Sequence, residues 1–249
     1  MNDTIKLLQN HVSIRNFKDE ELTEEQIKTI VKSAQMAATS SFMQAYSIIG
    51  VKNKDTKQKL AELAGNQAYV AKNGHFFVFC ADFYRHKLGA ELEQFNEPLA
   101  TESTEKFLVG SIDASLAAQN AVIAAESMGL GTVYIGGIRS NIEKVSKLLK
   151  LPDHVIPIVG LAVGYSDQES SIKPRLPLEN VYHVDQYEQN VELTKKQLQN
   201  YNQVISAYYS QRTNGIRNER WTEQMTKMLA SEKRLTLKSF LIQKQFLLK

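Results

Sequence analysis

The residues best suited to chemistry near the N-terminus lie in the stretch His-Val-Ser-Ile-Arg-Asn-Phe, residues 11–17. His11, Ser13 and Arg15 alternate with apolar residues, so in an extended segment their side chains share one face. An imidazole, a hydroxyl and a guanidinium on one face can bind a phosphate or another electron-rich ligand. A loop with solvated polar residues explains the same stretch, so the rest of the chain must decide between the two.

Four further motifs offer groups for an anion or a ring. Residues 39–41 place three hydroxyls after a helix, and Gln67 can donate and accept along the edge of a pyrimidine-like ring. Residues 134–137, Tyr-Ile-Gly-Gly, bring bare backbone close to a neighbour. Lys173 and Arg175 flank a proline, which stiffens an extended segment. Each motif alone also fits an ordinary turn or loop.

Other chemistries are disfavoured. The pair Gly129 and Gly131 follows a helix and lacks the third glycine of a dinucleotide fingerprint, because Tyr134 stands there. There is no phosphate loop, Ser111 lacks a nucleophile elbow, and the five histidines lack metal-ligand spacing. Cys80 is the single cysteine, within an apolar strand, so it is expected to be an inert core thiol.

Composition indicates a soluble globular protein of 249 residues with 43% hydrophobic and 23% charged residues. The net charge of +3 is too small to imply nucleic-acid binding, and acidic residues interrupt the basic C-terminal end. No apolar run is expected to reach the length of a membrane span, and no signal peptide is recognised. We therefore expect a cytoplasmic protein with no membrane partner.

Helix and strand signals alternate along the chain. Strands are expected at 46–51, 76–81, 132–135 and 155–163, and helices follow Thr23 and span about 56–64, 104–128 and 141–149. Residues 86–103 are polar and predicted to be irregular, and residues 188–249 contain only helical patterns. The pattern predicts an α+β protein with one domain, residues 1–249, and a helical extension over about 188–249.

In this order and spacing the motifs resemble the flavin-dependent nitroreductase superfamily. Within it, they resemble the NADPH-preferring branch of oxygen-insensitive nitroreductases and FMN reductases, over essentially the whole chain. The resemblance implies a central, mostly antiparallel sheet flanked by helices, and an intertwined homodimer. It also implies non-covalently bound FMN, NADPH as electron donor, and small-molecule acceptors such as nitroaromatics, quinones, free flavins or disulfides, reduced by a ping-pong cycle.

The resemblance also assigns roles by position. His11, Ser13, Lys173 and Arg175 would hold the phosphate and ribityl end of FMN, and Arg15 would lie by the flavin N1–O2 edge. Gln67 would read the N3–O4 edge, and the 134–137 backbone would lie near N5. The implied cofactor set is His11, Ser13, Arg15, Thr39, Ser40, Ser41, Gln67, Tyr134, Ile135, Gly136, Gly137, Lys173 and Arg175, with residues 39–41 from the partner subunit.

Two further points follow from the resemblance. Arg212 and Arg217 are similar to a basic loop that recognises the 2′-phosphate of NADPH, although solvated loop arginines would look the same. Val12 stands where the family often has arginine, so the FMN phosphate could be bound less tightly than in other members. No protein nucleophile is expected, because the flavin itself accepts the hydride.

Two alternatives stay open. A non-catalytic FMN carrier or redox-sensing protein would share every FMN contact but would not need Arg212 and Arg217. A nucleic-acid binder that uses the basic C-terminal helices is disfavoured by the interspersed acidic residues. The sequence does not select among the electron acceptors.

Overall fold

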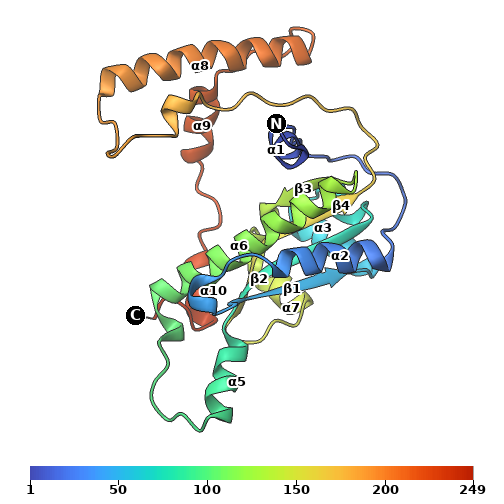
Figure 1. Ribbon diagram of the computed structural model, residues 1–249, viewed down its shortest axis with the longest axis vertical. Coiled ribbons are helices and arrows are strands. Elements are labelled where there is room, and N and C mark those ends of the chain that lie inside the picture. The colour runs from blue at the N-terminus through green and yellow to red at the C-terminus, as the bar shows by residue number, and fades with distance from the viewer. Residues whose placement is uncertain (249) are drawn as a thin grey trace. The chain divides into compact units, whose positions relative to one another are not determined.

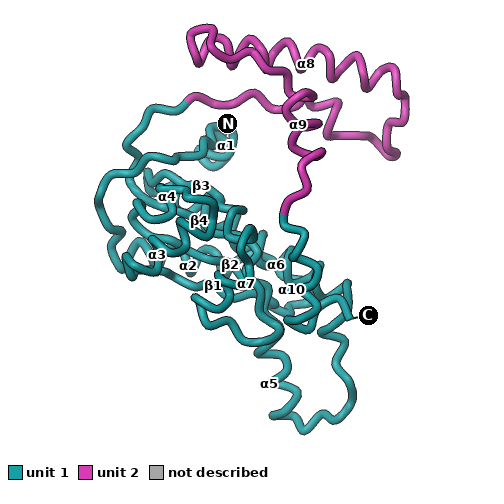
Figure 2. Tube along the Cα trace, turned by 180° about the vertical axis from the view of Figure 1, so that it is seen from behind, with its two compact units in different colours: residues 1–170, 234–249 teal, residues 171–233 magenta. Residues whose placement is uncertain are grey.

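The computed structural model describes residues 1–248. Two compact units make up the chain, and Figure 2 shows them in different colours. Unit 1 contains residues 1–170 and the C-terminal residues from 234 onward, and unit 2 contains residues 171–233. That the chain forms one domain over residues 1–249, with a helical extension from about residue 188, stays a prediction.

Unit 1 is built on a four-stranded sheet (Figure 1). Its strands are β1 (Tyr46–Val51), β2 (His75–Asp82), β3 (Gly131–Ile135) and β4 (Val155–Gly164), in the order β1-β2-β4-β3. Every neighbouring pair is antiparallel, which confirms the predicted sheet. β2 is buried along its whole length because it lies inside the sheet with helices on both faces.

Helices cover the two faces of the sheet. On one face, the alanines of α6 (Thr104–Ser127) pack with α2 (Glu24–Gln35) against Phe77 and Phe79. On the other face, α3 (Lys54–Leu63), α4 (Ala68–Ala71) and α7 (Ile142–Leu148) pack around Phe76 and Val78. The small side chains of α6 allow this close packing, as the sequence predicts.

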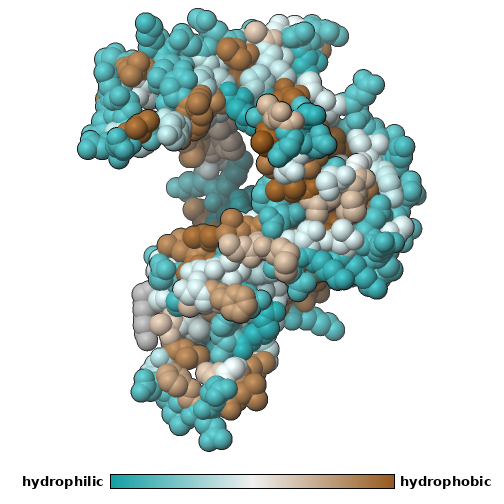
Figure 3. Space-filling model, in the orientation of Figure 1, coloured by the Kyte–Doolittle hydropathy of each residue, from teal (hydrophilic) through white to brown (hydrophobic). Residues whose placement is uncertain are grey.

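The expectation that no apolar run reaches the length of a membrane span is wrong, because α6 is long and apolar enough by length and composition. Its alanines are buried in the core of unit 1, so we interpret it as a core helix. Its outer face keeps an exposed apolar stripe of Leu108, Ile112 and Leu116. Hydrophobic surface gathers in Figure 3 where α6 runs in Figure 1.

The remaining elements are short or belong to unit 2. In unit 1 they are α1 (Asp3–Gln9), η1 (Ser40–Phe42), α5 (Tyr84–Leu92), η2 (Ala100–Glu102), η3 (Gly136–Arg139) and α10 (Leu237–Gln243). Helix α5 corrects the prediction of irregular structure over 86–103. Unit 2 contains η4 (Leu178–Asn180), α8 (Val191–Arg212) and α9 (Trp221–Leu229). From residue 188 to residue 248 the structure has no strand, as predicted.

Candidate functional site

The 11–15 segment lies against the edge strand β3. Ser13 forms a parallel bridge with Thr132, and the Ile14 amide donates to the Thr132 carbonyl at 2.8 Å. A Cβ on Gly131 would lie 2.7 Å from Ile14 Cγ1, so only glycine allows this approach. Ile14 is buried and Val12 packs against the same core cluster. Because successive side chains alternate, His11, Ser13 and Arg15 lie on the face opposite to Val12 and Ile14, as the alternation predicts.

His11 forms a hydrogen bond with a carboxylate that is not among the residues predicted from the sequence. Its Nδ1 lies 2.7 Å from Oε1 of Glu126, and the Thr132 hydroxyl donates to the same oxygen at 2.7 Å. Glu126 lies in the last turn of α6, 115 residues from His11. No local pattern signals a contact over that separation.

Arg15 is held by its backbone and left free at its side chain. The amides of Arg15 and Asn16 both donate to Oε1 of Gln168, each at 2.7 Å. Across residues 1–248 the Arg15 guanidinium has no hydrogen bond or ion pair. It is therefore an exposed, permanently charged group available to a ligand.

Gln67 and Gly137 lie against each other. A Cβ on Gly137 would overlap both Nε2 of Gln67 and the Ala64 carbonyl. Gln67 Nε2 donates to that carbonyl, and the Tyr69 hydroxyl donates to Gln67 Oε1. The amide therefore has a fixed orientation, with one proton and one lone pair left for another partner.

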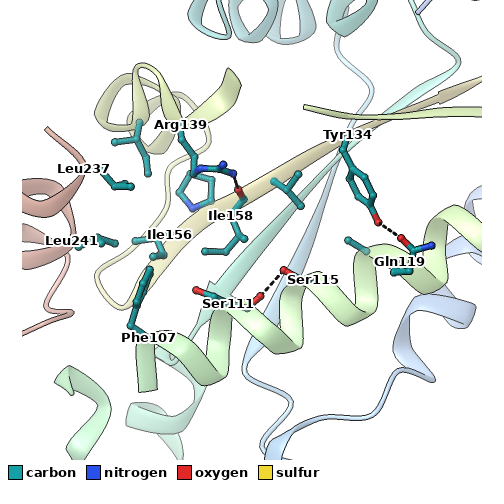
Figure 4. Close-up of a pocket in the computed structure, with 14 residues that line it drawn as sticks. Phe107, Ser111, Ser115, Gln119, Tyr134, Arg139, Ile156, Ile158, Leu237 and Leu241 are labelled. Atoms are coloured by element: carbon teal, nitrogen blue, oxygen red, sulfur yellow. Dashed lines mark hydrogen bonds between the residues drawn. The ribbon is translucent and has the colours of Figure 1, made fainter. Parts of the chain in front are cut away.

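Tyr134 borders a cleft of about 530 Å³ (Figure 4). The cleft is lined mainly by apolar residues of α6, β4 and α10, and the Tyr134 hydroxyl donates to Gln119 at 3.3 Å. Burial, together with the charge of Glu126, raises the pKa of Tyr134. Tyr134 therefore stays protonated at neutral pH and can act as a hydrogen-bond donor.

Two arginines lie near the Gly136 backbone. A Cβ on Gly136 would be 3.4 Å from Arg139 Nη2 and 3.8 Å from Arg234 Nη2. Arg139 donates to the Ile158 carbonyl, and its pKa is lowered by burial and by Arg234. Neither arginine is predicted from the sequence to belong to the site, because neither lies in one of the motifs described above.

The hydroxyl motif Thr39, Ser40 and Ser41 lies at the opposite edge of the sheet. It leads through η1 into β1, whereas the 11–15 segment lies on β3. The fully buried Asp113 accepts the amides of Ser40 and Ala45, each at 3.0 Å. Within one chain, the structure does not bring this loop to His11, Ser13 and Arg15.

Unit 2 gathers the four remaining predicted site residues around a tyrosine pair. Lys173 Nζ lies 5.2 Å from the centre of the Tyr209 ring, and the Arg217 guanidinium lies 4.4 Å from the same centre. Arg175 donates to the Lys173 carbonyl at 2.8 Å, and Arg212 donates to the Tyr208 hydroxyl at 2.8 Å. All four cations are exposed, and Arg217 is also paired with Glu219.

The charge of this cluster acts on Tyr208. Burial alone would raise the pKa of Tyr208, but hydrogen bonds with Ser171 and Arg212 and the nearby charges of Arg212 and Lys173 lower it. The hydrogen bond that Arg212 donates to the Tyr208 hydroxyl also holds the arginine in place. Over residues 1–248, no group of three His, Cys, Asp or Glu side chains could hold a metal ion.

Comparisons with known proteins agree over the whole chain. Residues 8–165 match the profile described as "Nitroreductase family", and residues 173–249 match its C-terminal domain. The chain is 52% identical over 246 residues to "FMN reductase (NADPH)" of Bacillus subtilis, with 99% of each chain covered.

Two solved structures are also similar. NfrA1 of B. megaterium has 59% identity and a TM-score of 0.97, with 99% of this chain and 100% of that chain covered. The NADPH:FMN oxidoreductase of Vibrio harveyi, solved with NAD+, has 38% identity and a TM-score of 0.89, with both chains covered completely.

Proposed function

This chain belongs to the nitroreductase family, and from that premise we propose that it is an NADPH-dependent FMN oxidoreductase that reduces small-molecule acceptors. The relatives described above are named for FMN reduction or nitroreduction. The observation that supports the proposal best is the placement of His11, Ser13 and Arg15 on β3, which leads directly into the Gly136–Gly137 backbone beside Gln67.

The residues present fit FMN. The Gly137 backbone lies against Gln67 with no space for a side chain, so bare backbone and an oriented amide stand together, as a flavin ring edge needs. The Arg15 guanidinium is exposed and without a protein partner over residues 1–248. Oxygen and nitrogen donors and cations predominate, which suits an anionic, hydrogen-bonding cofactor.

When bound, FMN would supply the chemistry of the reaction, since it can accept a hydride from NADPH and later pass two electrons to an acceptor. Arg15 is the residue that we assign to the N1–O2 edge. A guanidinium there stabilises negative charge in the reduced cofactor more than in the oxidised one, which is the differential binding that catalysis requires. Gln168 supports this role, because its Oε1 accepts from the backbone amides of both Arg15 and Asn16 and so holds the backbone of Arg15.

The phosphate and nucleotide ends are assigned to cations and hydrogen-bond donors. We assign His11, Ser13, Lys173 and Arg175 to the FMN phosphate and ribityl chain. Arg212 and Arg217 are assigned to the 2′-phosphate of NADPH, since guanidinium groups match phosphate oxygens in two-point hydrogen bonds. The exposure of all four unit 2 cations supports this assignment.

We also propose a homodimer. The loop at residues 39–41 lies at the β1 edge and the 11–15 segment at the β3 edge, so one chain cannot offer both to the same flavin through this sheet. The apolar stripe Leu108, Ile112 and Leu116 of α6 would be covered by the second copy. Cys80, buried and unpaired, is compatible with the reducing cytoplasm.

Steady-state kinetics test the proposal. NADPH oxidation is measured with nitroaromatics, quinones, free flavin and disulfides, at several fixed concentrations of each acceptor. A two-step cycle through one cleft predicts parallel double-reciprocal lines for every acceptor that is used. Intersecting lines would contradict the ping-pong cycle, and no turnover with any acceptor would favour the FMN carrier.

A further inference from the structure

Glu126 makes a contact that the proposed catalytic roles do not explain. Its Oε1 accepts from the Thr132 hydroxyl and lies 2.7 Å from His11 Nδ1. The Glu126 side chain is only 13% exposed, whereas that of His11 is 31% exposed. The mostly buried carboxylate of Glu126 therefore contacts the inner side of the His11 ring, whereas the ring itself is partly exposed.

This contact fixes the ring of His11. A carboxylate accepts but cannot donate when ionised, so Nδ1 carries the proton of this hydrogen bond. The other ring nitrogen, Nε2, has no hydrogen-bond partner in residues 1–248 and lies on the opposite side of the ring. When the ring carries both protons, Nδ1 donates to Glu126 and Nε2 remains to donate to an anion.

We propose that Glu126 is a positioning residue for the FMN phosphate and acts through His11. The inference rests on the proposed function, in which His11 binds that phosphate. This role and simple charge repulsion predict opposite effects of removing Glu126 on the affinity for FMN. A carboxylate near a phosphate repels it, so by charge alone the removal of Glu126 would tighten FMN binding. If Glu126 positions His11, its removal weakens FMN binding.

The test compares FMN with riboflavin, which lacks the phosphate. The full-length protein is freed of flavin and titrated with each ligand, and binding is followed by the quenching of flavin fluorescence. We expect Glu126→Gln to raise the Kd for FMN about tenfold, the effect of one hydrogen bond to a charged group. The Kd for riboflavin should not change. Glu105→Gln, an exposed glutamate in the first turn of the same helix, is the control.

A double-mutant cycle identifies the route of the effect. In the His11→Ala background, Glu126→Gln should cause no further weakening of FMN binding, because the residue that it positions is gone. Should Glu126→Gln fail to fold, Glu126→Asp gives the same test. The shorter side chain withdraws the carboxylate from Nδ1 but keeps its charge, so FMN binding should again weaken while riboflavin binding stays constant.

Unchanged or tighter FMN binding by the Glu126 variants would overturn the inference, as would equal weakening of both ligands. The proposed function fails separately. If the unmodified protein binds neither flavin, or binds FMN no better than riboflavin, the phosphate site itself is absent. If it prefers FMN and the Glu126 variants do not alter that preference, only the role of Glu126 is wrong.

Discussion

Arg15 and His11 are two residues apart and face the same side, but the protein holds them differently. His11 is bound to Glu126 through its side chain, whereas Arg15 is bound to Gln168 only through its backbone. A side chain bound to a fixed carboxylate suits the static task of holding a phosphate. The Arg15 guanidinium, exposed and without a protein partner over residues 1–248, is available to the charge that forms when the cofactor is reduced.

The two residues should therefore separate in their effects. We expect Arg15→Ala to slow flavin reduction by NADPH and to lower the flavin midpoint potential by roughly 30–60 mV, the equivalent of about 1.4–3 kcal/mol for two electrons. His11→Ala should chiefly weaken FMN binding. Potentiometric titration with FMN in excess measures the first effect, with Asn16→Ala as control. An unchanged potential in Arg15→Ala would contradict the role of Arg15.

His75 is a buried histidine away from the proposed flavin residues. It is 3% exposed, and its Nε2 has no hydrogen-bond partner. Burial, with the charges of Lys52 and Lys57, lowers the pKa of His75 to about 4. The unfolded chain, with a histidine pKa of about 6.5, binds this proton at a higher pH than the folded one. Folding therefore loses stability as the pH falls from about 6.5 to about 4.

Acid unfolding tests this. Between pH 7 and pH 5 the free energy of unfolding should fall by about 2 kcal/mol more in the unmodified protein than in His75→Gln, since one pKa unit corresponds to about 1.4 kcal/mol. Urea unfolding at both pH values measures the difference. His154, whose pKa is also lowered by burial, is present in both proteins and cancels. An equal loss of unfolding free energy in the two proteins between pH 7 and pH 5 would show that His75 does not cause the acid destabilisation.

At the scale of elements, the loop between α2 and β1 depends on one side chain of α6. Ser41 and Phe42 have positive φ angles of 47° and 58°, which are costly for residues with a side chain. Asp113, fully buried, accepts amides on both sides of this stretch, at Ser40 and Ala45. The core helix thereby fixes the loop that we assign to the partner's flavin.

Asp113→Asn should break one of these two hydrogen bonds, because the amide has only one acceptor oxygen. A buried amide left without a partner costs about 1–3 kcal/mol. We expect this loss in urea unfolding, together with weaker FMN binding. Asp55→Asn, at an exposed position of α3, is the matched control. Equal stability of Asp113→Asn and the unmodified protein would show that the loop holds its conformation without Asp113.

Local pattern predicted the elements better than it predicted their contacts. The strands and α6 follow from apolar runs and alanine spacing, and the alternation at 11–15 follows from period two. Helix α5 was not predicted because it has no buried residue, so no apolar face marks it. Glu126, Asp113 and Gln168 were not identified because each contacts residues at least 68 positions away, which no local spacing encodes.

At the scale of the whole molecule, unit 2 carries the exposed arginines that we assign to the 2′-phosphate of NADPH, Arg212 and Arg217. We expect the double variant Arg212→Ala and Arg217→Ala to raise the KM for NADPH about tenfold or more, since each charged hydrogen bond contributes about 1.5–3 kcal/mol. The KM for NADH, which has no 2′-phosphate, should change little. Arg220→Ala with Lys227→Ala, exposed cations of the same unit, is the control. An equal rise for both nucleotides would contradict the 2′-phosphate assignment.

As a whole molecule, the chain is expected to work as an NADPH-dependent flavin enzyme and not as a flavin carrier. The most direct measurement is the visible spectrum of the purified, FMN-loaded protein under anaerobic conditions. We expect the yellow absorbance to bleach when NADPH is added and to return when an acceptor is added. A spectrum that NADPH leaves unchanged, in protein shown to contain FMN, would contradict the account.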